Sequence, residues 1–296
     1  MTIGFCKRSF ILSIFLIVLC GNSAEAQLTD LARLEYSFIP SSKSEDQYTR
    51  LRAIINFPIK IKEKDYIIVG AEYNRIILNL EDTYPFNVKE LNRLHVIDLS
   101  LGYTFKSKKD WRFGVKINPR IASTLTTSLT TNDLFLNGGI FAIKDRTDAD
   151  IDKPYRLILG LTYNTTAGLP FPLPFVSYYR RINNNWSYSL GVPKSNLKYF
   201  FSERSMVQAF TSLDGYFANI QKPIEINGQL AESISLSVAV AGFGYEYCFT
   251  KHLVAYSYIG YTFRLNNVLR NGDRNEIFGL NELNAFYFRT GLKFKI

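Results

Sequence analysis

The sequence predicts an all-β protein, a closed antiparallel up-and-down transmembrane β-barrel of about 12–14 strands. Segments in which apolar and polar residues alternate recur along the chain after residue 26. The composition favours strands, with 19 Tyr and 23 Phe among 296 residues. The last twelve residues, "AFYFRTGLKFKI", form a strand pattern that is apolar on one face and basic on the other.

Residues 1–26 have the features of a cleaved signal peptide, so the barrel domain is expected to cover residues 27–296. Lys7 and Arg8 precede the apolar run "FILSIFLIVLC", and "AEA" has the small-x-small form of a cleavage site. The run is shorter than the ~20 residues of a membrane helix. Lipid attachment at Cys20 is the alternative, but Leu19 stands where a small residue is expected.

Cleavage would leave Cys248 as the one cysteine, so no internal disulfide can form. The mature chain stays basic, and its mean hydropathy is close to zero. A bundle of membrane helices would be far more apolar. A closed sheet is one way for such an exported chain to hold together without disulfides.

Alternating segments in the first half of the chain fall at 32–38, 50–59, 66–74, 97–105 and 111–121. In the clearest of them, Trp111, Phe113 and Val115 oppose Arg112 and Lys116. The polar face mixes Arg, Lys, Glu, Asn, Ser and Gly, as the wall of a lumen does. A soluble β-sandwich or a lipocalin-like barrel also alternates and is the competing interpretation.

Further strands are predicted at 155–163, 186–192, 234–240, 253–263 and 285–296. The apolar parity switches after Val240, which suggests a bulge near Ala241-Gly242. If "LKYFF" (197–201) is a short strand, the barrel has the larger number of strands; if 191–204 folds inward, it has the smaller. Three prolines in "LPFPLPF" (169–175) indicate a loop over the barrel mouth or an irregular strand start.

Strand lengths and turns fit an outer-membrane barrel. Ten residues at ~3.3 Å, tilted by ~40°, cover roughly 25 Å, the height of the apolar band. Aromatic residues gather near strand ends, as at membrane interfaces. Connections are short at 62–65, 106–110, 183–185 and 250–252, and long at 40–47, 79–92, after Thr124, 221–229 and 266–284. The eleven-residue stretch 144–154 is the exception, and the alternation places both termini in the periplasm of a Gram-negative bacterium.

The C-terminal strand should face lipid with one side and pair with the first strand, which removes the open edge. Its apolar residues also resemble the C-terminal signal that the barrel-insertion machinery recognises, although that signal ends in an aromatic residue and this chain ends in Ile. The residues of the expected signal are Phe286, Phe288, Leu292, Phe294 and Ile296. The expected partners are therefore outer-membrane lipids and the insertion machinery.

The mature chain resembles an outer-membrane β-barrel family of Bacteroidetes defined only as a domain of unknown function (DUF6268-like). Its most characteristic part is "PFPLPFVSYYRRINNNWSYSLGVPKSNLKYFFSERSMVQAF" (170–210). The resemblance implies fold and location and supplies no catalytic residues.

Basic residues prevail on the parity that should face the lumen, and acidic ones there are fewer, namely Glu35, Glu72 and Asp98. A net-positive lumen would favour a small anionic solute. Alternatively, the charges pair and fill a plugged barrel. The expected lumen-lining basic residues are Arg50, Arg52, Arg112, Lys116, Arg156, Arg289 and Lys293.

Enzymatic chemistry has one weak candidate, His95, which could act as general base in a lipid-modifying hydrolase. A histidine at the lipid headgroup level is the simpler interpretation. The acidic run Asp145, Asp148, Asp150 and Asp152 lacks calcium-loop spacing and reads as a solvated turn. No metal, cofactor or nucleic-acid partner is expected. A solute pore is the leading hypothesis; a hydrolase and a filled structural or adhesive barrel are the alternatives.

Overall fold

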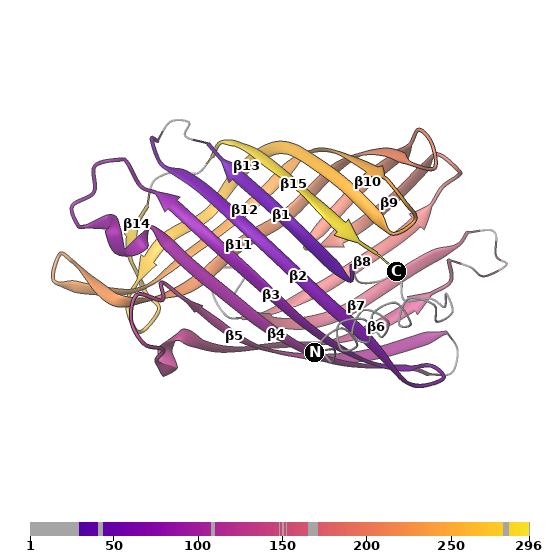
Figure 1. The fold of residues 1–296 in the computed structure, drawn as a ribbon, viewed down its shortest axis with the longest axis horizontal. Coiled ribbons are helices and arrows are strands. Elements are labelled where there is room, and N and C mark those ends of the chain that lie inside the picture. Colours follow the sequence, from indigo (N-terminus) through magenta and orange to yellow (C-terminus); the bar gives the residue numbers. More distant parts are fainter. Residues whose placement is uncertain are drawn as a thin grey trace, which may run out of the picture.

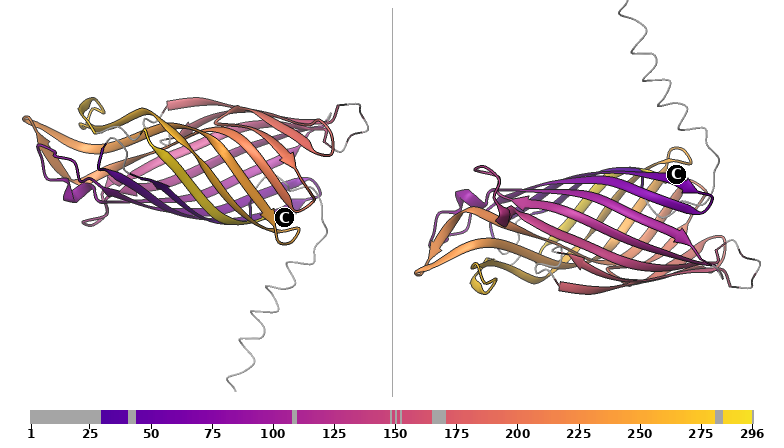
Figure 2. Two further views of the ribbon diagram at one scale, coloured as in Figure 1. Left: turned by 90° about the horizontal axis from the view of Figure 1, so that it is seen from above. Right: turned by 90° about the horizontal axis from the view of Figure 1, so that it is seen from below.

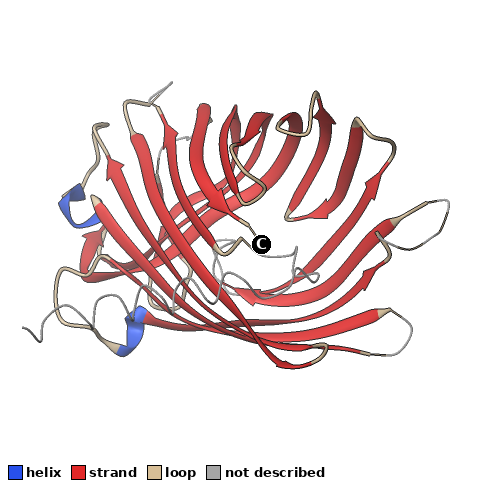
Figure 3. Cartoon of the chain, turned by 45° about the vertical axis from the view of Figure 1, so that its right-hand side comes forward, coloured by secondary structure: helices blue, strands red, loops and turns tan. Residues whose placement is uncertain are grey.

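A computed structural model describes residues 30–40, 44–107, 110–147, 149, 151, 153–164, 171–280 and 284–295. The expected signal peptide, Asp148, Asp150, Asp152 and Ile296 lie outside the described residues. The described chain is nearly all sheet, with two short 3₁₀ helices, η2 (Val88–Leu91) and η3 (Thr131–Asp133) (Figure 3). No helix in this part of the chain is long and apolar enough to cross a bilayer.

The described strands form a closed, antiparallel, up-and-down barrel of 14 strands, which confirms the predicted fold class (Figure 1). The strand "LKYFF" exists, as β10, so the larger predicted number is the right one. The barrel strands are β1 (Ala32–Ile39), β2 (Gln47–Lys62), β3 (Asp65–Asn79), β4 (Arg93–Lys106), β5 (Trp111–Ser123), β6 (Leu134–Asp145), β7 (Tyr155–Asn164), β8 (Phe171–Arg181), β9 (Trp186–Val192), β10 (Lys194–Phe200), β11 (Ser205–Ile226), β12 (Gln229–Cys248), β13 (Leu253–Arg270) and β15 (Phe286–Phe294).

Closure comes from the last strand, as the absence of an open edge requires. β15 pairs with β1 on one side, with Phe288 opposite Phe38, and with β13 on the other. Among the described strands, the short strand β14 (Glu276–Gly279) pairs only with β13 and stands outside the closed wall.

The outward face is apolar. Large apolar side chains on it are exposed, from 38% for Phe288 to 74% for Phe286. Aromatic rings form contact chains near the turns, as where Tyr103, Phe105 and Phe113 follow one another. Exposure of this kind around a whole barrel indicates a surface that faces hydrocarbon.

The two ends of the barrel differ. At the short-turn end, β2 and β3 are joined by residues 63–64 and β12 and β13 by 249–252. At the long-loop end, longer connections join β3 to β4 and β13 to β15, and the β11–β12 hairpin extends beyond the neighbouring strands (Figure 2). The long loop predicted over 221–229 is wrong, because Asn227 and Gly228 make a tight turn with positive φ of 50° and 78°.

At the long-loop end a smaller ring closes inside the full barrel. Asn219 on β11 pairs with Ser123 on β5, across β6 to β10. The strands β1–β5, β11–β13 and β15 therefore enclose a space of their own, here called the small ring. It is filled by fully buried apolar side chains that include Ile76, Leu94, Ile220 and Ile234.

This apolar filling overturns one prediction. Ile234, Leu236, Val238 and Val240 on β12 face the small ring and are at most 2% exposed. Phe243, on the opposite parity, faces outward at 68% exposure. No parity switch therefore occurs at Ala241-Gly242, and the register shift lies between Ser237 and Val238.

Candidate functional site

The inner wall carries a network of ion pairs that joins distant strands. Arg50 on β2 reaches across to Asp214 on β11 through two hydrogen bonds of 2.9 and 2.7 Å. Arg289 on β15 donates to the same carboxylate at 2.6 Å. Glu35 on β1 lies 3.7 Å from Arg289 and accepts a hydrogen bond of 2.7 Å from Tyr256. These groups tie the first, second, eleventh and last wall strands together.

Two further clusters on the inner wall also pair charged side chains. Arg52 holds Glu72 with two hydrogen bonds of 2.8 and 2.9 Å. Glu246 on β12 is 1% exposed and receives Lys293 at 2.7 Å. It also accepts hydrogen bonds from Gln208 and Tyr258, both at 2.8 Å. A carboxylate with several donors is held firmly, because each donor offsets part of its desolvation.

The remaining predicted lumen residues near the short-turn end are also engaged. Arg156 pairs with Asp145 at 2.6 Å. Arg112 donates to the carbonyl oxygen of Lys64 at 3.0 Å and lies over the Tyr66 ring. Most of the predicted basic residues are thus paired with carboxylates, including some that the strand pattern did not indicate.

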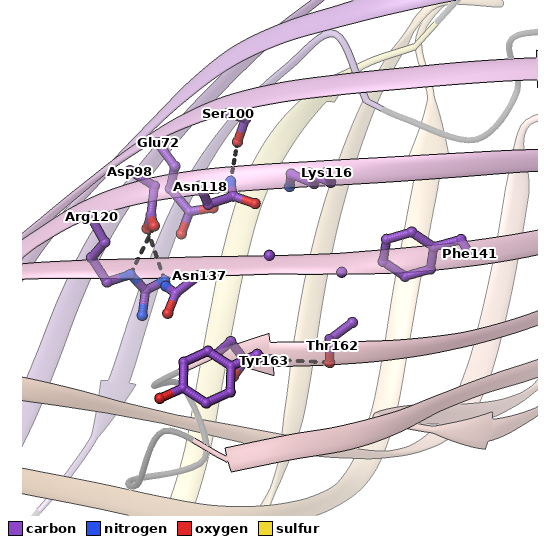
Figure 4. Close-up of a pocket in the computed structure, with 13 residues that line it drawn as sticks. Glu72, Asp98, Ser100, Lys116, Asn118, Arg120, Asn137, Phe141, Thr162 and Tyr163 are labelled. Atoms are coloured by element: carbon purple, nitrogen blue, oxygen red, sulfur yellow. Dashed lines mark hydrogen bonds and ion pairs between the residues drawn. The ribbon is translucent and has the colours of Figure 1, made fainter.

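Between the inner faces of β3 to β7 lies a cavity of about 190 Å³ (Figure 4). One side is charged and amide-rich, with Arg120 bound to Asp98 by bonds of 2.8 and 2.9 Å. The other side includes the ring of Phe141, which packs edge-on against Phe175 on β8 at 5.7 Å. The lining residues are Glu72, Asp98, Ser100, Lys116, Asn118, Arg120, Asn137, Gly138, Gly139, Phe141, Thr162, Tyr163 and Asn164.

Lys116 differs from the other predicted lumen cations. It lines the cavity from β5 and is exposed within it (Figure 4). Among the residues that the structure describes, no carboxylate forms an ion pair with Lys116, whereas five of the other predicted cations do so. The two carboxylates that share the cavity, Glu72 and Asp98, are held by Arg52 and Arg120, so the ammonium group can meet an anion inside the barrel.

His95 lies on the outward face of β4. Its Nδ1 is 2.9 Å from the hydroxyl of Tyr73, and the two rings are stacked. Ser123 is opposite His95 in the β4–β5 register, but its side chain is fully buried and bonds to Asp133. The geometry of a serine and its general base is thus not formed at this position.

The C-terminal residues point in the directions that the alternation predicts. Phe286, Phe288 and Leu292 are exposed on the outside, while Arg289 and Lys293 turn inward to their carboxylates. Phe294 lies at the short-turn end beside the His252 ring. Whether the insertion machinery recognises these residues stays a prediction.

The acidic run 145–152 is described only in part, and Asp145 is the member that the structure places, bound to Arg156. Within the described part of the chain, no three His, Cys, Asp or Glu side chains gather in a way that could hold a metal ion.

Sequence reasoning missed Asp214 and Glu246, the two carboxylates around which the network is built. Both carboxylates lie on the inward face of long strands. Asp214 shares that face with Phe210, Ser212 and Tyr216. That alternation in 206–216 was the available signal.

The chain matches the family described as "Domain of unknown function (DUF6268)" over residues 22–295. The chain belongs to this family. Such a match spans the whole barrel and fits the resemblance that the sequence suggested. No curated protein matches the DUF6268 chain.

Several solved barrels are similar to this DUF6268 structure. The translocator domain of autotransporter NalP from Neisseria meningitidis has 11% identity and a TM-score of 0.36, covering 98% of this chain and 95% of that one. The toluene transporter TodX from Pseudomonas putida has 12% identity and a TM-score of 0.34, covering 94% and 92%. A mutant Rh. blastica porin has 13% identity and a TM-score of 0.32, covering 90% and 98%. At such scores the likeness assigns no function.

Proposed function

We propose that this barrel spans the outer membrane of a Gram-negative bacterium and carries a small anionic solute through its lumen cavity. The apolar outward face and the aromatic rings near the turns support the membrane assignment. The unequal ends support an orientation with the short turns and both termini in the periplasm. Fractionation of a host's membranes by density tests the location.

Lys116 is the observation that carries the proposed solute class. It is the cavity cation without an ion-pair partner among the described residues, and it stands among amide and hydroxyl groups of Asn118, Asn137 and Thr162. A positive charge with neighbouring polar groups favours an anion over a cation. Of the two described cations that line the cavity, Arg120 is bound to Asp98, which leaves Lys116 as the cavity cation that can bind an anion.

The filled small ring favours a binding-controlled carrier over a wide, permanently open pore. Side chains such as Leu94, Ala122 and Ile220 are at most 1% exposed where an axial channel would run. A plugged structural barrel is the second candidate, since the same filling supports it. The hydrolase hypothesis has no comparable support, because His95 bonds to Tyr73.

Inorganic sulfate is a suitable probe. We expect the protein in lipid nanodiscs to bind sulfate saturably, and Lys116→Gln to weaken that binding at least tenfold, about 1.4 kcal/mol or more. Lys251→Gln is the matched control, because Lys251 is exposed in the turn between β12 and β13. Sulfate uptake into proteoliposomes would then separate a carrier from a plugged barrel. Absence of saturable binding, or an equal effect of both variants, would overturn the proposal.

A further inference from the structure

Between β8 and β11 the hydrogen-bonded wall of the described barrel is interrupted. β9 pairs with β8 only from Val176 onward, so the stretch Phe171–Phe175 has β7 as its one strand partner among the described residues. On the other side, the pairing of β10 with β11 ends at Ser212. Beyond that point β11 turns to β5 and pairs there through Asn219. The missing strand pairing between these two stretches is here called the β8–β11 gap.

The sequence of β8 suits a strand that is paired on one side. Pro172 and Pro174 both lie in the stretch that has no partner on its far edge. Proline is tolerated at sheet edges because it presents no N–H group to a missing neighbour. The β9–β10 hairpin ends at the edge of the gap, where the Leu213 N–H group donates to the carbonyl oxygen of Pro193 at 2.9 Å. Local sequence and pairing thus agree that the gap is part of the fold.

The inner surface beside the gap is apolar. Leu161 and Tyr163 face outward and pair with Pro174 and Pro172, which places Phe171, Leu173 and Phe175 on the lumen side. Leu173 is directly opposite Thr162, and Phe171 is opposite Asn164. Both Thr162 and Asn164 line the cavity. An apolar strip therefore runs from the gap to the cavity that holds Lys116.

This arrangement contrasts with the rest of the lumen. At the long-loop end the small ring is filled, and on β3 to β5 the residues that line the cavity are charged or polar. Phe141 and Phe175 supply an aromatic surface on the side opposite to these groups. The cavity is thus polar on one side and aromatic on the other.

We propose that the solute is an amphipathic anion, with an apolar ring or short chain next to its anionic group, that enters sideways from the bilayer through the β8–β11 gap. This inference rests on the proposed function. The anionic group would meet Lys116, and the apolar part would lie against Phe141, Phe175 and Leu173. A solute that partitions into the membrane would reach the cavity without crossing the apolar filling of the small ring.

Two anions with related head groups test the solute class. We expect 2-naphthalenesulfonate to bind at least tenfold more tightly than inorganic sulfate in nanodiscs, after subtraction of binding to empty nanodiscs. Leu173→Ala and Phe175→Ala should each weaken naphthalenesulfonate binding several-fold more than they weaken sulfate binding. Val176→Ala, on the outward face of the same strand, is the matched control. If sulfate binds through Lys116 but the naphthyl group adds nothing, the inference is wrong and the proposed function stands.

Thiol labelling tests the route and does not depend on ligand affinity. In a Cys248→Ser background, Leu173→Cys places a thiol beside the gap, and Ile68→Cys places one on the inner face of β3, where the wall is complete on both sides. We expect membrane-partitioned pyrene maleimide to label the first thiol at least tenfold faster than the second. Equal rates would overturn sideways entry, whatever the binding data show.

Discussion

Arg50 and Asp214 form a two-pronged ion pair across the lumen, with N–O distances of 2.9 and 2.7 Å. Arg289 reaches the same carboxylate, so one acidic group on β11 holds two guanidinium groups from β2 and β15. The pair joins β2, the neighbour of the first wall strand, to β11, one of the long strands of the small ring. Its loss would leave the two guanidinium groups to share Glu35, which lies 4.0 Å from Arg50 and 3.7 Å from Arg289.

Asp214→Asn should therefore destabilise the folded barrel by about 3–5 kcal/mol, because breaking one side of a buried pair leaves the other side uncompensated. Reversible urea unfolding in lipid vesicles measures the change. Asp273→Asn, in the exposed loop after β13, should have little effect. A loss for Asp214→Asn no larger than for the control would show that the network is not structural.

The β5–β11 junction (Ser123, Thr124, Asp133, Asn219 and Gln221) holds the small ring closed. Asn219 and Gln221 each donate to Asp133 at 2.8 Å, and Thr124 N–H donates to the Asn219 carbonyl oxygen at 3.1 Å. Replacing both Asn219 and Gln221 by Ala removes these side-chain bonds, each of which contributes about 1.5–3 kcal/mol.

We expect this double variant to raise ion conductance in planar bilayers above the wild-type value, because β11 can then leave β5. Gln229→Ala, at the exposed tip of the same hairpin, is the control. Unchanged conductance in the double variant would mean that the small ring stays closed by its apolar filling alone.

Asp133 gives the junction a dependence on pH. Burial would raise the pKa of its carboxyl group, but hydrogen bonds from Ser123, Thr130, Asn219 and Gln221 bring the pKa below its ordinary value. The stabilisation is therefore present above the unfolded value near 3.8 and is lost as pH falls through the depressed pKa.

Hydrogen exchange of the Asn219–Gln221 amides should accordingly be slow at pH 5 and above, and should show accelerated opening only below about pH 4. Asp133→Asn should speed opening at neutral pH and remove the acid-dependent step. Opening that sets in near pH 6 would point to another titrating group.

Much of the fold followed from alternation, because lipid and lumen impose opposite chemistries on the two faces of a strand. The pattern of Trp111, Phe113 and Val115 needed no tertiary information. Alternation failed for Ile234 and Leu236, because apolar side chains that fill the small ring have the same sequence spacing as those that face lipid. The strand pairing in the structure is needed to tell these two kinds of apolar side chain apart. Likewise, the sequence placed Lys116 in the lumen, but its lack of an ion pair depends on Arg52 and Arg120 holding the two cavity carboxylates, Glu72 and Asp98.

Phe294 should matter for assembly more than for the stability of the finished barrel. It closes the apolar side of β15, opposite Ala32 on β1. We expect Phe294→Ala to lower the fraction of heat-modifiable, assembled protein in cells, while the purified, refolded variant unfolds nearly as the wild type does. Phe249→Ala, in an exposed turn, is the control. Normal assembly of the Phe294 variant would contradict a role in the insertion signal.

A matched pair of Leu→Arg variants tests the membrane assignment itself. Leu101 on β4 and Leu230 on the β11–β12 hairpin have similar exposed fractions, 55% and 51%, so a barrel in water would hydrate both side chains equally. If the belt that contains Leu101 faces hydrocarbon, Leu101→Arg should cost about 2–4 kcal/mol in lipid vesicles. Leu230→Arg, beyond the belt, should stay within about 0.5 kcal/mol. Since a water-exposed site would tolerate either arginine, equal stabilities of the two variants would show that no bilayer surrounds the barrel.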